Sequence, residues 1–353
     1  LTFQLDNGSP RYAVARGDVE LVRPSPLGFV LQDAPPLTNG FEAVDVRRMD
    51  GDETWTPVWG SASEVRNRYN ELEATLRESG APHRTMILIF RAYDDGVAFR
   101  YVLPEQSNLT SFAILSEETA FRFGGDYTAW WHPVDYNGDE KLYRETPLSK
   151  MEALNTPVTM KVPNGIHLSV HEAALVDYAS MTLVPVQGDA NSFKCDLVPW
   201  PDGVKVKAKT PMKTPWRTIQ IADRAGGLIE SHLIENLNEP CAIEDTSWIE
   251  PMKYMGIWWG MHIGKESWAA GPTHGATTEN ARHYIDFAAS NGIRGLLIEG
   301  WNTGWETWFN GATFSFTKAY PDFDLRWLAK YARKHGVALI GHHETGGNIP
   351  AYE

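Results

Sequence analysis

The stretch Gly295-Leu296-Leu297-Ile298-Glu299-Gly300-Trp301-Asn302 decides the fold of the second half of this chain. A short apolar run that ends in a carboxylate and a glycine is typical of a buried β-strand. Parallel α/β folds place their chemistry at the carboxyl ends of such strands. Glu299 is therefore a candidate catalytic residue. The residue pattern leaves a second interpretation open, in which Glu299 caps the next turn or forms a salt bridge.

Around this stretch, strand-like and helix-like patterns alternate. Strands are predicted at Tyr254–Met261, Ile293–Ile298 and Val337–Ile340, and helices at Thr278–Ser290 and Phe323–His335. Strands that alternate with helices predict right-handed parallel crossovers. A (β/α)8 barrel needs roughly 250 residues, and three βα units are too few to close one. We expect a β-rich first half followed by the first part of such a barrel, with the chain truncated inside it.

The first half of the chain shows the short alternating runs of an all-β domain. The clearest signal is a hairpin in which Asp95-Gly96 lies between the runs Thr85–Phe90 and Val97–Leu103. The only helix predicted in this half covers residues 61–79, with Ser63 as its N-cap. We therefore expect a large antiparallel β-sandwich.

The composition divides the chain into three parts. Residues 236–250 are rich in Asn, Pro and acidic residues without periodicity, which indicates a linker. The predicted sandwich thus covers residues 1–235, and the predicted incomplete catalytic barrel covers residues 251–353.

Charge and aromatic content restrict the class of partner. The net charge of −13, from 32 basic and 45 acidic residues, argues against a nucleic-acid or anionic-membrane partner. The 14 Trp, 13 Tyr and 14 Phe residues suit either a site that stacks sugar rings or a large β core. No apolar run reaches the length of a membrane span. Two cysteines are too few for a disulfide framework.

An aromatic loop follows Glu299. Trp301, Asn302, Trp305 and Trp308 occur within eight positions. Such a loop after a strand can form a wall on which sugar rings stack, or it can pack between the two domains. The pattern favours neither interpretation.

The third predicted strand ends in His342-His343-Glu344. Adjacent residues on a strand point to opposite faces, so only some of the three can face one site. Zinc enzymes take their ligands from helical spacings or separate loops. Hydrogen bonding to substrate hydroxyls is therefore the favoured role for this segment.

The segment 135–140 is an acidic loop that superficially resembles the start of an EF-hand. It lacks the glycine at the sixth position and the glutamate at the twelfth, so it is not an EF-hand. A carboxylate in it, such as Glu140, could reach a cation or a sugar, or simply be solvated. The chain also contains no P-loop, no dinucleotide-binding glycine motif and no Gly-x-Ser-x-Gly.

Taken together, several segments resemble glycoside hydrolase family 97, and the resemblance covers nearly the whole chain. The segments that carry it include Tyr127-Thr128-Ala129-Trp130-Trp131, Val170-His171-Glu172-Ala173-Ala174-Leu175, Glu299-Gly300-Trp301-Asn302, Tyr320-Pro321-Asp322-Phe323-Asp324 and His342-His343-Glu344-Thr345. The resemblance implies an N-terminal β-super-sandwich, a catalytic (β/α)8 barrel and a further C-terminal β domain. It also implies calcium and an α-linked glucose or galactose substrate.

The family has an inverting α-glucosidase-like branch and a retaining α-galactosidase-like branch. The residues at 299–302 and 342–344 resemble the inverting branch, which implies that Glu299 is a general base. The resemblance implies substrate binding by Trp301, Asn302, His343 and Glu344. The expected function is calcium-dependent, exo-acting hydrolysis of α-glucans or oligosaccharides. The alternatives are a retaining α-galactosidase of the same family and a non-catalytic carbohydrate-binding sandwich.

The resemblance also implies one calcium ligand from the sandwich. Glu140 is the predicted ligand, with Glu172 and Glu145 as alternatives. The proton donor, the partner base and the other calcium ligands of the family are expected beyond residue 353, so we expect residues 1–353 alone to be inactive. A periplasmic or secreted location, with a signal peptide removed, is expected. The sequence specifies neither the linkage preference nor the oligomeric state.

Overall fold

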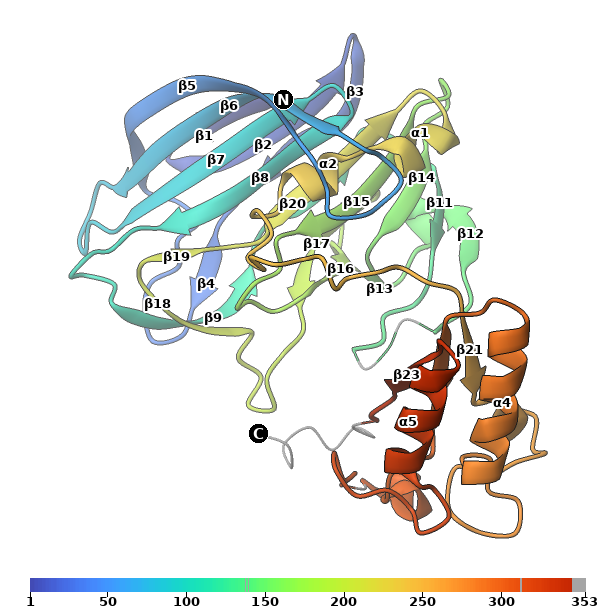
Figure 1. The fold of residues 1–353 in the computed structure, drawn as a ribbon. Coiled ribbons are helices and arrows are strands. Elements are labelled where there is room, and N and C mark those ends of the chain that lie inside the picture. Colours follow the sequence, from blue (N-terminus) through green and yellow to red (C-terminus); the bar gives the residue numbers. More distant parts are fainter. Residues whose placement is uncertain (137, 139, 312, 345–353) are drawn as a thin grey trace. The chain divides into compact units, whose positions relative to one another are not determined.

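The computed structural model describes residues 1–353 except 137, 139, 312 and 345–353 (Figure 1). The chain divides into two compact units, Leu1–Ala242 and Ile243–Glu353. The division falls inside the segment whose composition predicts a linker. No helix among the described residues is both long and apolar enough to cross a membrane.

The first unit is built from antiparallel sheets (Figure 1). Among the described residues, one sheet has seven strands in the order β1 (Thr2–Asp6), β2 (Ser9–Arg16), β3 (Val19–Pro26), β10 (Ala120–Phe123), β17 (Ser192–Leu197), β16 (Met181–Pro185) and β13 (Leu154–Asn155). A second sheet has the order β12 (Arg144–Pro147), β11 (Thr128–Trp131), β14 (Val158–Lys161), β15 (His167–Ala173), β20 (Trp216–Ala222), β8 (Gly96–Leu103), β7 (Thr85–Tyr93), β6 (Val65–Glu78) and β5 (Phe41–Trp55), and β19 (Met212–Lys213) also pairs with β8. A smaller sheet has the order β18 (Val206–Lys209), β9 (Ser111–Glu117) and β4 (Phe29–Leu31).

The core of the sandwich follows from the alternation along its strands. β2 and β7 bury every second side chain over most of their length, which is the pattern of a sheet with one face covered. Many of the aromatic residues lie in this core, for example Tyr12 and Phe99, whose ring centroids are 4.4 Å apart. The predicted antiparallel sandwich and the hairpin between β7 and β8 are confirmed.

The predicted helix over residues 61–79 is wrong, and Ser63 caps no helix there. This segment forms the strand β6, which pairs with β5 on one side and β7 on the other. Its Leu, Glu, Ala and Arg residues favour a helix when taken alone. Two ladders of hydrogen bonds and the burial of Ala74 and Leu76 override that local preference.

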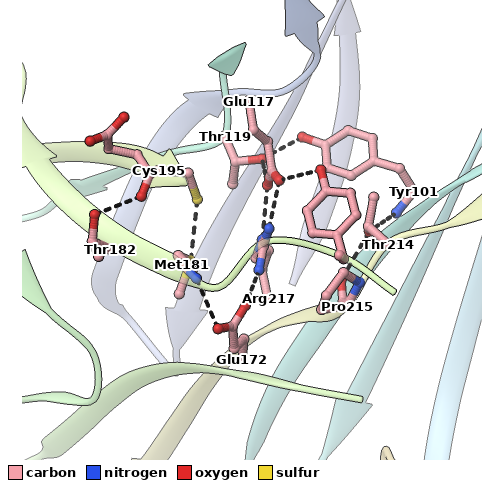
Figure 2. A network of polar contacts seen from close by, with 12 residues as sticks. Tyr101, Glu117, Thr119, Glu172, Met181, Thr182, Cys195, Thr214, Pro215 and Arg217 are labelled. Carbon is pink, nitrogen blue, oxygen red and sulfur yellow. Dashed lines mark hydrogen bonds and ion pairs between the residues drawn. The ribbon is translucent and has the colours of Figure 1, made fainter. Parts of the chain in front are cut away.

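A buried ionic network joins the three sheets (Figure 2). On β20, Arg217 donates two hydrogen bonds of 2.8 and 2.6 Å to Glu117 of β9, and one of 2.6 Å to Glu172 of β15. The backbone N–H of Met181, on β16, donates to Glu172. The side chains of Arg217 and Glu117 are fully buried. Each charge is paired and hydrogen-bonded, as burial requires.

The second unit contains three parallel strands in the order β21 (Tyr254–Ile257), β22 (Gly295–Ile298) and β23 (Ala338–Gly341). The connections carry the helices α4 (Thr278–Ser290) and α5 (Leu325–Lys334). The predicted βα units are confirmed, although β21 is shorter than predicted because Trp259–His262 forms the short helix α3. The remaining helical elements are η1 (Leu148–Lys150), α1 (Ala225–Glu230), α2 (Leu233–Asn236) and η2 (Trp305–Asn310).

Polar caps fix where the two long helices begin. The side chain of Thr277 accepts a hydrogen bond from the backbone N–H of Asn280, and that of Asp324 accepts one from Trp327. One face of each helix is buried in the apolar cluster that also contains Leu296 and Ile298 of β22. This packing leaves the carboxyl ends of the three strands adjacent to one another, where the predicted site residues begin.

Candidate active site

Glu299 directly follows β22 at the carboxyl edge of the parallel sheet. Its backbone N–H donates to the carbonyl of Ile257 at 3.1 Å, which fixes it beside the end of β21. Its Oε2 accepts a 2.9 Å hydrogen bond from the indole Nε1 of Trp268, and its Oε1 lies 3.9 Å from Nδ1 of His342. The side chain is 18% exposed. An oriented carboxylate that solvent still reaches can accept a proton from water.

Gly300 allows the chain to turn beside Trp268. Its φ is +74°, and a Cβ at this position would lie 2.8 Å from the backbone oxygen of Trp268. A side chain here would therefore be strained and would collide with the neighbouring backbone. The close approach of these two backbones brings the Trp268 indole to the Glu299 carboxylate.

A buried histidine supports the same turn from the other side. His274 contacts the carbonyl of Gly300 through Nε2 at 2.9 Å and a carboxylate oxygen of Asp322 through Nδ1 at 2.8 Å. Both partners accept, so an imidazole that carries a proton on each nitrogen satisfies both contacts. His274 and Asp322 thus connect the loop after Glu299 to the residues that precede α5.

His342 lies between two carboxylates. Its Nδ1 faces Glu299 at 3.9 Å, and its Nε2 faces Glu344 at 3.8 Å. The ring of His343 instead packs against Trp301 and Phe316, with centroid distances of 5.4 and 4.5 Å. The three neighbours therefore divide between two sides, as strand alternation predicts. Burial, and then the nearby His342, lower the pKa of His343, which favours its neutral form.

Trp301 and Asn302 are buried and engaged within the chain. The indole of Trp301 is 6% exposed and donates a 2.9 Å hydrogen bond to the carbonyl of His342. Asn302 is fully buried and donates to the carbonyl of Ser315 at 2.8 Å. The Trp301 bond holds the loop after β22 to the residue that follows β23, and the Asn302 bond holds it to Ser315. Substrate contact by Trp301, Asn302, His343 and Glu344 stays a prediction.

Several aromatic rings pack around Trp268, the hydrogen-bond partner of Glu299. Trp268 stacks on Trp305, with ring centroids 6.0 Å apart and an interplanar angle of 11°. Trp268 also makes edge-to-face contacts with Trp308 and His262. Trp305 and Trp308, which the sequence assigns equally to a sugar wall or to packing between domains, here pack against each other at 5.2 Å. Sequence reasoning missed Trp268. It lies in an irregular segment between α3 and α4, where no periodicity links it to Glu299.

The described residues do not form a calcium shell. Calcium requires roughly six to eight oxygen ligands, and no group of three or more His, Cys, Asp or Glu among the described residues is arranged to hold a metal. Glu140 is exposed, so its carboxylate can supply one oxygen of the kind that calcium prefers. Of the alternatives, Glu172 is engaged by Arg217, and Glu145 accepts a 3.2 Å hydrogen bond from Trp130.

Comparison with known protein families gives two matches that cover most of the chain. Residues 1–240 match the family model described as "Glycosyl-hydrolase 97 N-terminal". Residues 258–353 match the model described as "Glycoside hydrolase 97". Both units therefore match models of the same family.

Solved structures and curated proteins agree with these matches. A glycoside hydrolase family 97 enzyme from Pseudoalteromonas sp. strain K8, in complex with acarbose, is 42% identical over 99% of this chain and 53% of its own, with a TM-score of 0.94. A variant of the enzyme from that strain, in complex with panose, gives the same identity and TM-score. A retaining alpha-galactosidase from Bacteroides thetaiotaomicron is 26% identical over 94% of this chain and 53% of its own. The chain thus spans about half the length of the relatives that it matches.

Proposed function

This chain belongs to glycoside hydrolase family 97, and we propose from that premise that the enzyme it forms part of hydrolyses α-glucosides with inversion, using Glu299 as a general base. The observation that carries the proposal is the carboxylate of Glu299, which is partly exposed and oriented by Trp268 at the carboxyl end of β22. Oligosaccharides that end in an α-linked glucose are the proposed substrates.

The proposal that the substrates are α-glucosides is supported by the sequence identity to relatives with different ligands and names. Two of the structures at 42% identity hold acarbose and panose, and panose is built of α-linked glucose units. The curated alpha-galactosidases are only 26% and 27% identical to this chain. Their names nevertheless make retaining hydrolysis of α-galactosides the second candidate function.

The geometry around Glu299 indicates how it would act. Its Oε2 is occupied by the Trp268 N–H, which leaves Oε1 to accept a proton from the attacking water. Inversion needs a second carboxyl group, roughly 6.5–9.5 Å away, to protonate the leaving oxygen. The family resemblance places that acid outside residues 1–353, and within this chain His342 lies between Glu299 and Glu344.

The stereochemistry of the product tests this proposal. With the full-length enzyme and an α-glucoside, proton NMR during the first turnovers is expected to show β-glucose before mutarotation mixes the anomers. Early release of the α-anomer would contradict inversion and favour the retaining alternative. A parallel reaction with an α-galactoside distinguishes the two substrate classes, because only the second candidate function predicts its turnover.

Trp268→Phe is expected to lower kcat/KM of the full-length enzyme at least about tenfold, because a hydrogen bond to a charged group is lost. Trp327→Phe on the exposed side of α5 is the matched control. An unchanged kcat/KM in the Trp268 variant would show that the indole does not orient the base.

We also propose that the full-length enzyme requires calcium, with Glu140 as the ligand from the first unit. The support is the family resemblance together with the exposed carboxylate of Glu140. Chelation by EGTA is expected to lower the hydrolysis rate at least about tenfold, because it removes the ion that the roughly six to eight oxygen ligands would hold. Added calcium should restore the rate. Full activity in EGTA would contradict the requirement.

A further inference from the structure

A pocket in the first unit gathers cations in an otherwise acidic chain. It has a volume of about 740 Å³ and is lined by residues of β8, β9, β18 and β19. Pockets of roughly 300–1,000 Å³ accept small organic ligands. Its cations are Arg100, Lys207, Lys209 and Lys213. The chain as a whole carries a net charge of −13, so this cluster is not explained by composition.

Figure 1 shows the strands β8, β9, β18 and β19, whose residues line this pocket together. Lys207 and Lys209 are two residues apart on β18 and therefore share one face of that strand. Lys213 pairs with Val102, which is two residues from Arg100 on β8. Opposite residues on paired strands share a face, so Lys213 and Arg100 also point to the same side. The pocket lies where these two strand pairs meet.

Arg100 is the cation that most requires a partner. Its guanidinium lies over the ring of Trp216 at 4.3 Å, and Arg91 lies over the same ring at 4.9 Å. Arg91 is paired with Glu71 at 2.6 Å. Within the part of the chain that the structure describes, Arg100 has no salt bridge, and its buried Nε has no hydrogen-bond partner. Burial, and then Arg91, lower the pKa of Arg100.

The other cations divide into two that are paired and one that is not. Lys207 contacts Asp202 at 2.6 Å, and Lys213 contacts Glu239. Lys209 is exposed and makes no salt bridge to any described residue. Arg100 and Lys209 thus leave two positive charges available to a ligand. An anion placed between them would relieve the cost of an unpaired, half-buried guanidinium.

We propose that this pocket of the first unit binds an acidic saccharide through its carboxylate. The Arg100 guanidinium, whose plane is fixed by stacking on Trp216, takes the carboxylate through its planar fork of N–H donors, and Lys209 adds a second charge. Phe112 and Met212 supply apolar lining for a sugar ring. Asp177 and Glu239 also line the pocket, which disfavours ligands that carry several negative charges.

The test measures binding to the full-length protein by calorimetry at constant, low ionic strength. The probes are sodium glucuronate, neutral glucose and sodium sulfate. Glucuronate is expected to bind, and glucose is expected to bind at least about tenfold more weakly, because one charge-assisted pair changes affinity about tenfold or more. Sulfate is expected to bind no more tightly than glucuronate. Equal binding of glucuronate and glucose would overturn the proposal. Sulfate binding more tightly than glucuronate would also overturn it, in favour of a simple ion site.

Variants locate the site. Arg100→Gln is expected to weaken glucuronate binding at least about tenfold, and Lys209→Gln about threefold. Lys161→Gln, an exposed lysine at the end of β14, is the matched control and should bind like the unaltered protein. Because Lys209 is exposed, its replacement tests the site even if Arg100→Gln unfolds the sheet. Unchanged binding in Lys209→Gln would overturn the assignment.

The result is independent of the proposed hydrolysis. Lys209→Gln should leave the rate of α-glucoside hydrolysis unchanged, since no residue assigned to the proposed hydrolysis lines this pocket. Loss of glucuronate binding together with normal hydrolysis would support the second site. Normal glucuronate binding in every variant would reject it and leave the role of Glu299 unaffected.

Discussion

Glu299→Gln is expected to lower kcat of the full-length enzyme by about 10²–10⁴-fold, because the side chain loses its ability to accept a proton from water. Glutamine has the same shape, and its amide oxygen can still accept the hydrogen bond that Trp268 donates to Glu299. The loop should therefore keep its structure, and KM should change little. Steady-state kinetics on an α-glucoside, with the melting temperature of each variant, measures the effect.

Glu279→Gln provides the control for the Glu299 variant. Glu279 is an exposed carboxylate in the first turn of α4, so its loss removes a negative charge from the same unit without touching the site. Its kcat should stay within a factor of about two. If Glu299→Gln kept most of its kcat, Glu299 would not be the general base. The carbohydrate-binding alternative, in which the sandwich alone recognises sugar, would then gain support.

Arg217→Met is expected to destabilise the first unit by about 3–5 kcal/mol, because it leaves Glu117 and Glu172 buried without their cation. The free energy of unfolding in urea, followed by tryptophan fluorescence, measures the change. Arg224→Met is the matched control, since Arg224 forms an exposed pair with Glu230, and exposed pairs contribute little. Equal effects of the two substitutions would contradict the importance of the buried network.

The pH dependence of stability tests the same network. Burial alone would raise the pKa of Glu117, but Arg217 outweighs it and holds this pKa below the ordinary value of 4.5. A carboxyl with a lowered folded-state pKa stabilises the fold above its unfolded pKa, and this stability is lost as the pH falls through the folded value. Stability should therefore fall below about pH 4.5. In Arg217→Met this part of the pH dependence should disappear.

Local signals in the sequence predicted most of the fold. The Asp95-Gly96 turn, for example, fixes the hairpin of β7 and β8 through neighbours only a few residues away, so a window of sequence contains the information. β6 was predicted wrongly because its strand form depends on β5 and β7. Their ladders are not visible in its own residues.

The sequence likewise predicted only part of the candidate site. Glu299 could be placed at a strand end because an apolar run leads directly to it. Its contact with Trp268 spans 31 residues, and the Arg217–Glu117 pair spans 100. Contacts of this kind depend on how loops and sheets come together, and no spacing rule encodes them. The buried role of Trp301 depends likewise on His342, which follows β23 and lies 41 residues along the chain.

The Glu117–Arg217–Glu172 network also bears on how the first unit folds. Arg217 and Glu172 face each other on paired strands of one sheet, whereas Glu117 lies 100 residues from Arg217 and on a strand of a different sheet. Glu117 gains its cation only when these two sheets have come together, so a partly assembled intermediate carries an uncompensated carboxylate. Such an arrangement disfavours partial unfolding and makes the sheets gain or lose structure as one cooperative unit. We also expect the first unit to fold slowly, because segments that are distant in sequence must meet before the Glu117–Arg217 pair contributes.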